Sequence, residues 1–175
     1  MSTVNAPLPD AEQLLETLAA QLRPAVTERT ALIGIHTGGV WVAQRLHRLL
    51  GIELPLGTID IAFYRDDYAR RGLSPKVRPS DIPFDVSDCD IVLVDDVLYT
   101  GRTIRAALNE LFDYGRPGRV RLAALVDRGG RQLPIAPQFV GATVAVADDE
   151  QIVLRRDGNG KLSLAVERGP GGSAR

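Results

Sequence analysis

Short apolar strands that alternate with amphipathic helices constrain this chain more than any other feature. The run ALIGI, residues 31–35, ends at a glycine-containing turn and leads into a helical pattern that Gly51 closes. The run DIVLV, residues 90–94, leads into a second helical pattern, and RLAALVD, residues 121–127, is a further strand candidate. This alternation predicts an α/β fold with a mostly parallel central sheet flanked by helices.

The two ends of the chain add a helix and a hairpin to this core. Apolar residues recur with a helical period over residues 11–22, and Asp10 is placed to cap the first turn. Two strand patterns flank the turn DGNG, residues 157–160, which predicts a terminal β-hairpin. We expect a single domain over residues 1–168 and a disordered tail over 169–175, because the glycine-rich tail has nothing to bury.

Between these elements lies a charged stretch without a sustained apolar period. A strand pattern at residues 59–63 precedes it, and it runs from Tyr64 to Asp81 with two prolines. We expect a mobile arm that closes over a site, because long loops without structure in compact domains are often functional. The alternative is a solvated insertion. A strand is also expected over residues 139–146.

Composition excludes several classes of protein. The chain has 21 basic and 22 acidic residues, a balance that disfavours a general polyanion binder but leaves room for a local basic patch. A single cysteine, Cys89, rules out an intramolecular disulfide. The first residues lack the pattern of a signal peptide, and no apolar run approaches the roughly 20 residues that span a bilayer. We therefore expect a cytoplasmic protein with no membrane partner.

The stretch VDDVLYTGRT, residues 94–103, carries the clearest chemistry. Two adjacent carboxylates, Asp95 and Asp96, follow a buried strand, and a turn with Gly101 then opens a helix. Helix N-termini favour phosphate, and ionised carboxylates accept hydrogen bonds from vicinal hydroxyls. The combination predicts a ribose 5-phosphate pocket at the carboxyl edge of the sheet. The alternative is that the acids merely end a strand and Thr103 is an ordinary helix cap.

Residues 91–103 resemble the phosphoribosyl-pyrophosphate-binding motif of type I phosphoribosyltransferases. More narrowly, they resemble the pyrimidine operon regulators that also have uracil phosphoribosyltransferase activity. Further segments agree with that family in order and spacing: GIHTGG (34–39), IDIAFYRDD (59–67), GRP (115–117) and LVDRGGRQLP (125–134). The resemblance extends over residues 11–167 and implies the type I phosphoribosyltransferase fold.

The resemblance also implies roles for individual residues. Asp95 and Asp96 would contact the ribose hydroxyls and, with Arg65 of the arm, form the catalytic set. The phosphoribosyl pyrophosphate site as a whole would comprise Asp95, Asp96, Val97, Leu98, Tyr99, Thr100, Gly101, Arg102 and Thr103. The cofactor would be Mg²⁺, held through substrate oxygens and water without a direct protein ligand.

Two further loops would complete this implied site. A pyrophosphate loop would consist of Thr37, Gly38 and Gly39, whose backbone amides face the leaving group. The base and pyrophosphate would be bordered by Val126, Asp127 and Arg128.

The activity implied is the conversion of uracil and phosphoribosyl pyrophosphate to UMP and pyrophosphate, in a homodimer or higher homo-oligomer that senses pyrimidine nucleotides. An alternative is a catalytically weak or inactive nucleotide-binding regulator of pyrimidine genes. Salvage of another base, such as a purine, is a third hypothesis. Tyr99 stands where some purine enzymes have a carboxylate, which favours a pyrimidine.

Departures from the family pattern bear on both halves of this function. Gly39 stands where the family usually has arginine, a change that would remove a pyrophosphate donor and lower the rate. Gly130, Ala142 and Thr17 replace residues of the basic face that contacts RNA in attenuating members. The remaining candidate contacts for pyr leader messenger RNA are Arg131, Arg116 and Arg119, for which the alternative is solvated surface.

Overall fold

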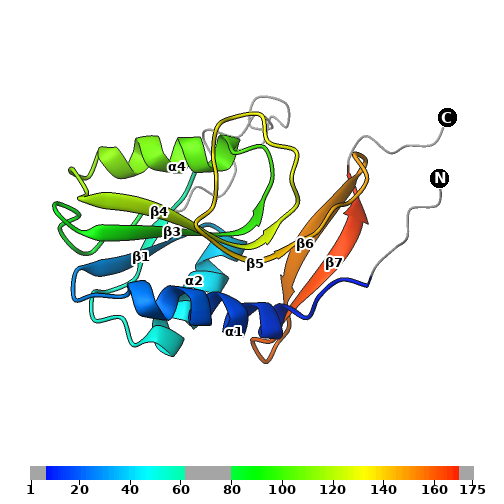
Figure 1. Cartoon of the computed structure of the whole chain (residues 1–175), viewed down its shortest axis with the longest axis horizontal. Coiled ribbons are helices and arrows are strands. Elements are labelled where there is room, and N and C mark those ends of the chain that lie inside the picture. Colours follow the sequence, from blue (N-terminus) through cyan, green and yellow to red (C-terminus); the bar gives the residue numbers. More distant parts are fainter. Residues whose placement is uncertain (1–6, 62–79, 170–175) are drawn as a thin grey trace.

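A parallel sheet with helices on both faces forms the body of the molecule (Figure 1). The computed structural model describes residues 7–61 and 80–169. Nearly all of the predicted arm, including Arg65, lies outside these residues, as do residues 170–175 of the predicted tail. Within them, five strands lie in the order β2-β1-β3-β4-β5: β1 Thr30–Ile35, β2 Gly57–Ile59, β3 Asp90–Leu98, β4 Arg119–Asp127 and β5 Phe139–Thr143.

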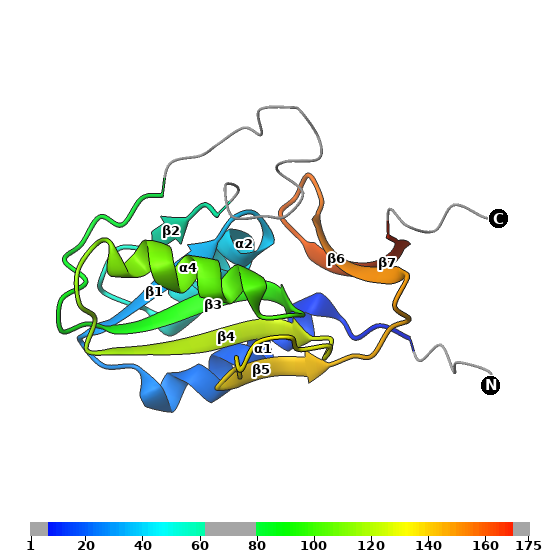
Figure 2. The ribbon, with the colours of Figure 1, turned by 90° about the horizontal axis from the view of Figure 1, so that it is seen from above.

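In the described part of the chain, three helices cover the sheet. They are α1 (Ala11–Leu22), which continues as a short 3₁₀ turn (Arg23–Ala25), α2 (Gly38–Leu50) and α4 (Arg102–Phe112). Figure 2 shows α4 on one face, with α1 behind the sheet. Strand side chains alternate between the faces: Leu32 and Val92 pack in the cluster of α1 and α2, whereas Ile33 and Leu93 pack in that of α4. Both faces are buried, which explains the continuous apolar runs in the sequence. No described helix is long and apolar enough to cross a membrane.

The strand order places a switch point between β1 and β3. The chain leaves β1 toward β2 on one side, whereas β3, β4 and β5 follow one another on the other side. Connections that leave neighbouring parallel strands in opposite directions open a crevice at their carboxyl ends, where ligands bind in open α/β sheets. The loop after β1 and the turn after β3 therefore meet at the edge where the sequence predicts the site.

The edge strand β5 is hydrogen-bonded on its outer side by the side chain of Gln21. β5 ends at Thr143, earlier than the expected residue 146. Gln21 of α1 donates from Nε2 to the carbonyl of Val140 (2.7 Å), and its Oε1 accepts from the Val140 amide (3.1 Å). A single carboxamide thus satisfies two backbone groups at an edge that would otherwise invite another strand.

The predicted terminal hairpin is present as β6 (Glu150–Arg156) and β7 (Leu162–Arg168). It lies beyond the carboxyl ends of the sheet strands (Figure 2). Its apolar side chains Ile152, Leu154 and Leu162 join the core on the face of α1 and α2. Because that core is shared, the hairpin is an integral part of the domain.

The helix ends confirm some predictions and correct others. Asp10 caps α1 by accepting from the amides of Glu12 and Gln13, and Gly51 ends α2 in the left-handed conformation, both as expected. Gly101, with φ of 92°, caps α4 in place of Thr103. α4 ends at Phe112, with Asp113 as its C-cap.

Candidate functional site

The paired acids lie within a strand. The sequence places the end of this strand at Val94, but β3 continues to Leu98 because it pairs with β4 as far as Leu98 opposite Asp127. Asp95 is buried, with 6% of its surface exposed, whereas Asp96 is partly exposed. Asp95 accepts a hydrogen bond from the Asp96 amide (3.0 Å), and Asp96 accepts one from the Val97 amide (2.8 Å). These local bonds hold both carboxylates at the carboxyl end of the central strand.

The glycine loop after β1 lies directly on these acids. A Cβ added to Gly39 would lie 2.5 Å from the carbonyl oxygen of Val94, and one added to Gly38 would lie 2.1 Å from Oδ2 of Asp96. Real Cβ atoms do not approach so closely, so glycine allows the loop backbone to lie directly against the end of β3 at both positions. Thr37 is exposed beside them. The structure therefore joins two of the three predicted segments of the site.

This packing changes the interpretation of Gly39. By family resemblance, Gly39 replaces an arginine. In the structure, however, the atom nearest to an added Cβ is the Val94 carbonyl oxygen, a backbone atom of β3 that cannot rotate away. At Gly38 the nearest atoms belong to the Asp96 side chain, which can rotate. In this backbone, therefore, position 39 has no room for an arginine, whereas position 38 has a neighbour that can move.

The turn after β3 presents a helix N-terminus to the same edge. Gly101 takes a left-handed conformation that other residues rarely adopt, and it starts α4. The Thr100 hydroxyl accepts from the Arg102 amide (3.2 Å), which orders the turn. Thr103 lies in the first turn of α4 and is partly exposed. Backbone amides at such a helix start favour an anion.

The loop after β4 is bound to this turn by backbone bonds. The Arg128 amide donates to the Leu98 carbonyl (3.0 Å), and the Gln132 amide donates to the Thr100 carbonyl (2.9 Å). Val126, the first residue of the predicted base-bordering set, is fully buried in β4 opposite Val97. The loops after β1, β3 and β4 therefore converge at the carboxyl edge of the sheet. The predicted arm lies outside the described residues.

Arg131 holds this third loop together. Its guanidinium donates to the carbonyls of Tyr99 (2.6 Å) and Ile135 (2.9 Å) and pairs with Asp127 (2.6 Å). Burial raises the pKa of Asp127, but the bonds from Arg131 and the Gly129 amide outweigh it and leave that pKa below its ordinary value. In this structure, the guanidinium of Arg131 is thus engaged in internal contacts.

Arg128 and Tyr99 form a pair that the sequence does not reveal. The guanidinium carbon lies 3.9 Å from the centre of the Tyr99 ring, and the same group donates to the Glu150 carbonyl (2.8 Å) at the start of β6. A hollow of about 450 Å³ beside the pair is lined by Tyr99, Arg128, Asp148, Asp149, Glu150, Gln151 and Gly169. The hairpin residues have no motif, so only their spatial position assigns them to the site.

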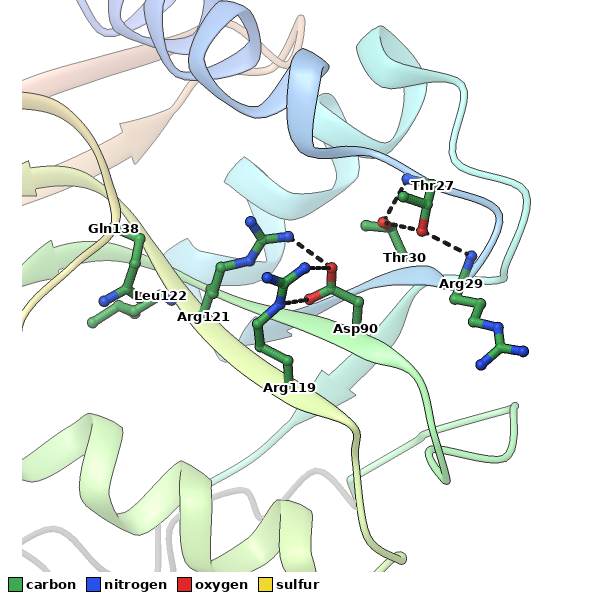
Figure 3. Close-up of polar contacts among 8 residues, drawn as sticks. All are labelled: Thr27, Arg29, Thr30, Asp90, Arg119, Arg121, Leu122 and Gln138. Atoms are coloured by element: carbon green, nitrogen blue, oxygen red, sulfur yellow. Dashed lines mark hydrogen bonds and ion pairs between the residues drawn. The ribbon is translucent and has the colours of Figure 1, made fainter.

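The other two candidate RNA contacts lie at the opposite edge of the sheet. Arg119 begins β4, and Arg116 precedes it and is exposed. Figure 3 shows two neighbouring guanidinium groups bound to Asp90, with bonds of 2.7 Å from Arg119 and 2.8 Å from Arg121. Arg131, by contrast, follows the carboxyl end of β4. The three candidate arginines therefore do not form one continuous face of the chain, and their contact with RNA remains a prediction.

Comparison with known proteins identifies the class. The model of the phosphoribosyl transferase domain matches residues 6–153. The chain therefore belongs to the phosphoribosyltransferase family. Among solved structures, it resembles a purine phosphoribosyltransferase from Pyrococcus horikoshii, with a TM-score of 0.60 and 28% identity over 77% of this chain and 82% of that one. A hypoxanthine phosphoribosyltransferase from Staphylococcus aureus shares the fold, with a TM-score of 0.64 and 18% identity over 83% of this chain and 80% of the other.

Relatives with higher sequence identity bear one particular name. A protein of Pseudomonas paraeruginosa named bifunctional protein PyrR is 52% identical over 165 residues, which cover 92% of this chain and 95% of the relative. A protein of the same name from Ralstonia nicotianae is 53% identical over 155 residues, or 86% of this chain and 88% of the relative. Within the phosphoribosyltransferases, the chain thus groups with the bifunctional PyrR proteins.

Proposed function

We propose that this protein transfers the phosphoribosyl group of phosphoribosyl pyrophosphate to uracil, forming UMP and pyrophosphate, and that it regulates pyrimidine genes by sensing pyrimidine nucleotides. One observation carries the enzymatic half: the glycine loop at Gly38 and Gly39 lies against the Asp95–Asp96 pair, beside the start of α4. Phosphoribosyl pyrophosphate would then lie among three kinds of group: backbone amides for its pyrophosphate, carboxylates for its ribose and a helix N-terminus for its 5-phosphate.

In this proposal the protein acts mainly by positioning. Asp95 and Asp96 accept hydrogen bonds from the ribose hydroxyls, while the turn from Tyr99 to Thr103 holds the 5-phosphate. Thr37, Gly38 and Gly39 hold the leaving pyrophosphate, so that the bond at the anomeric carbon lies between two fixed ends of the substrate. Displacement there has oxocarbenium character, and a fixed geometry with donors at the leaving group lowers its barrier.

We propose Mg²⁺ as the cofactor. The described residues contain no group of three metal-binding side chains, and Asp95 is largely buried. We expect the ion to be held by substrate oxygens and water, as Mg²⁺ often is, without a direct protein ligand. The ion would supply charge neutralisation to the departing pyrophosphate.

The base would lie near the Arg128–Tyr99 pair. The backbone around Val126, Asp127 and Arg128 borders this space, and Tyr99 occupies the position that carries a carboxylate in some purine enzymes. A purine substrate is the competing hypothesis. The 28% identity to the purine phosphoribosyltransferase of Pyrococcus horikoshii is the reason to include purines in the test.

A turnover assay tests the catalytic half. Protein incubated with phosphoribosyl pyrophosphate, Mg²⁺ and either uracil, hypoxanthine or guanine should form UMP from uracil and little product from the purines. Asp96→Asn should lower kcat/KM about 10–100-fold, because a charged hydrogen bond is worth about 1.5–3 kcal/mol. Asp113→Asn removes an exposed carboxylate after α4 and is the control, with an expected activity equal to wild type. Absence of UMP at every pH would refute the activity.

A regulator with little or no turnover is the second candidate. The observation that favours it is that the pyrophosphate loop has Gly39 where the family usually has an arginine. Nucleotide-dependent binding to a pyr leader RNA, measured by fluorescence anisotropy without turnover, would support this candidate. Arg116→Ala and Arg119→Ala should weaken that binding if the amino edge of the sheet contacts RNA. We further propose a cytoplasmic homodimer or higher homo-oligomer, which light scattering would test.

A further inference from the structure

A second hollow lies away from the phosphoribosyl site. It has a volume of about 600 Å³ and lies between α1, α2 and the β6–β7 turn, lined by Glu12, Arg45, Arg48, Leu49, Asn159, Gly160 and Lys161. Ligand pockets typically range from about 300 to 1,000 Å³, so this volume suits a ligand of nucleotide size. None of these residues belongs to the loops that form the first site.

The lining of this hollow carries a net positive charge. Three cations, two from α2 and one from the β6–β7 turn, face one acid. That acid is already bound: Glu12 accepts from Arg45 Nη1 (3.1 Å) and from the Leu162 amide (2.9 Å). Within residues 7–61 and 80–169, the structure shows no ion pair for Arg48 or Lys161. Like charges held around one hollow repel one another, and an anion bound between them removes that repulsion.

We propose that this hollow binds a small phosphate-bearing anion of nucleotide size. Arg48 on α2 and Lys161 on the hairpin turn donate to the phosphate, and Arg45, which also lines the hollow, is paired with Glu12. Charge-assisted bonds to phosphate oxygens are among the strongest hydrogen bonds in proteins. Leu49 and the side chain of Asn159 border the remainder of the ligand.

The shared carboxylate gives the ligand an effect on the hairpin. Glu12 binds both Arg45 and the first amide of β7. A phosphate that attracts Arg45 therefore competes with Glu12 for this guanidinium, and Glu12 is the carboxylate that connects β7 to α1. The other strand of the hairpin supplies the Glu150 carbonyl that holds Arg128 in the first site. The hollow is therefore placed to sense a nucleotide at a distance from the catalytic loops.

The test locates binding by NMR on the full chain. UMP, inorganic phosphate and uridine are titrated separately against ¹⁵N-labelled protein, with sodium chloride matched to the ionic strength of each. UMP and phosphate should shift the amides of Gly160, Lys161 and Leu162 saturably, and uridine should not. The double variant Arg48→Ala/Lys161→Ala should weaken this response at least tenfold while leaving shifts at residues 101–103 unchanged.

A charge-matched control separates a site from a general field. Arg23→Ala/Arg29→Ala removes two exposed cations elsewhere and should alter neither response. The proposal is overturned if UMP and phosphate shift only the amides of residues 101–103, if sodium chloride or uridine reproduces the shifts, or if Arg48→Ala/Lys161→Ala binds phosphate as wild type does. It is likewise overturned if Arg48→Ala/Lys161→Ala weakens binding of RNA but does not weaken binding of UMP or phosphate.

Discussion

Replacing Gly39 with alanine tests how closely the loop after β1 must approach β3. The added Cβ would lie 2.5 Å from the Val94 carbonyl oxygen and 3.2 Å from the Asp95 Cα, both backbone atoms. Ordinary contact requires at least about 3.4 Å, so the loop must move away by about 0.9 Å. Overpacking of this kind costs about 1–3 kcal/mol of stability.

The larger effect should be on catalysis. A misplacement of about 1 Å at a reacting centre costs about 10²-fold in rate, and this loop is the proposed cradle of the pyrophosphate. We expect kcat/KM for phosphoribosyl pyrophosphate to fall about 100-fold in Gly39→Ala, with weaker product inhibition by pyrophosphate. The assay is UMP formation under saturating uracil, combined with urea denaturation to measure stability.

Gly158→Ala is the matched control for this change. It makes the same chemical substitution at a glycine whose added Cβ would have no atom within 4 Å and whose φ is not left-handed. Its kcat/KM should equal that of wild type, with a stability change within about 1 kcal/mol. Wild-type turnover and stability in Gly39→Ala would refute the argument that this loop lies in fixed contact with β3.

Three further changes test other parts of the structure. Hydrogen bonding by Arg45 keeps the pKa of Glu12 below its ordinary value of 4.5. The ionised carboxylate therefore stabilises the folded chain above pH 4.5, and this contribution is lost as pH falls through the lowered pKa. The urea midpoint of wild type should fall over this acid range, whereas that of Glu12→Gln should depend less on pH. Gln21→Ala should reduce the unfolding free energy by about 1 kcal/mol, because Val140 loses two partners at the edge of β5, and an unchanged urea midpoint would contradict this. Gly130→Ala places a Cβ 2.4 Å from the Tyr99 ring and so disturbs the contact of that ring with Arg128. The KM for uracil should rise about threefold to tenfold. Gly129→Ala, with a similar φ and no atom within 4 Å of the added Cβ, should leave this KM unchanged.

The fold and the motif of residues 94–103 could be predicted from the sequence, because both depend on residues that are close together along the chain. The alternation of apolar strands and helices predicts the parallel sheet, and the turn residues 157–160 predict the hairpin. The same logic locates the loops after β1, β3 and β4, since parallel strands that follow one another must end at the same edge. Errors at strand ends, such as the placement of Asp95 and Asp96 after β3, arise because pairing with β4 decides where a strand stops.

The contacts that connect distant segments required the tertiary structure. Only the packed chain shows that Gly39 lies on a strand carbonyl, that Arg131 binds inward and that Glu12 joins α1, α2 and β7. Sequence by itself determined which elements form and which loops share an edge, because periodicity and turn chemistry act over a few residues. Tertiary structure decided which side chains are free to meet a ligand, because that depends on neighbours up to 150 residues away along the chain.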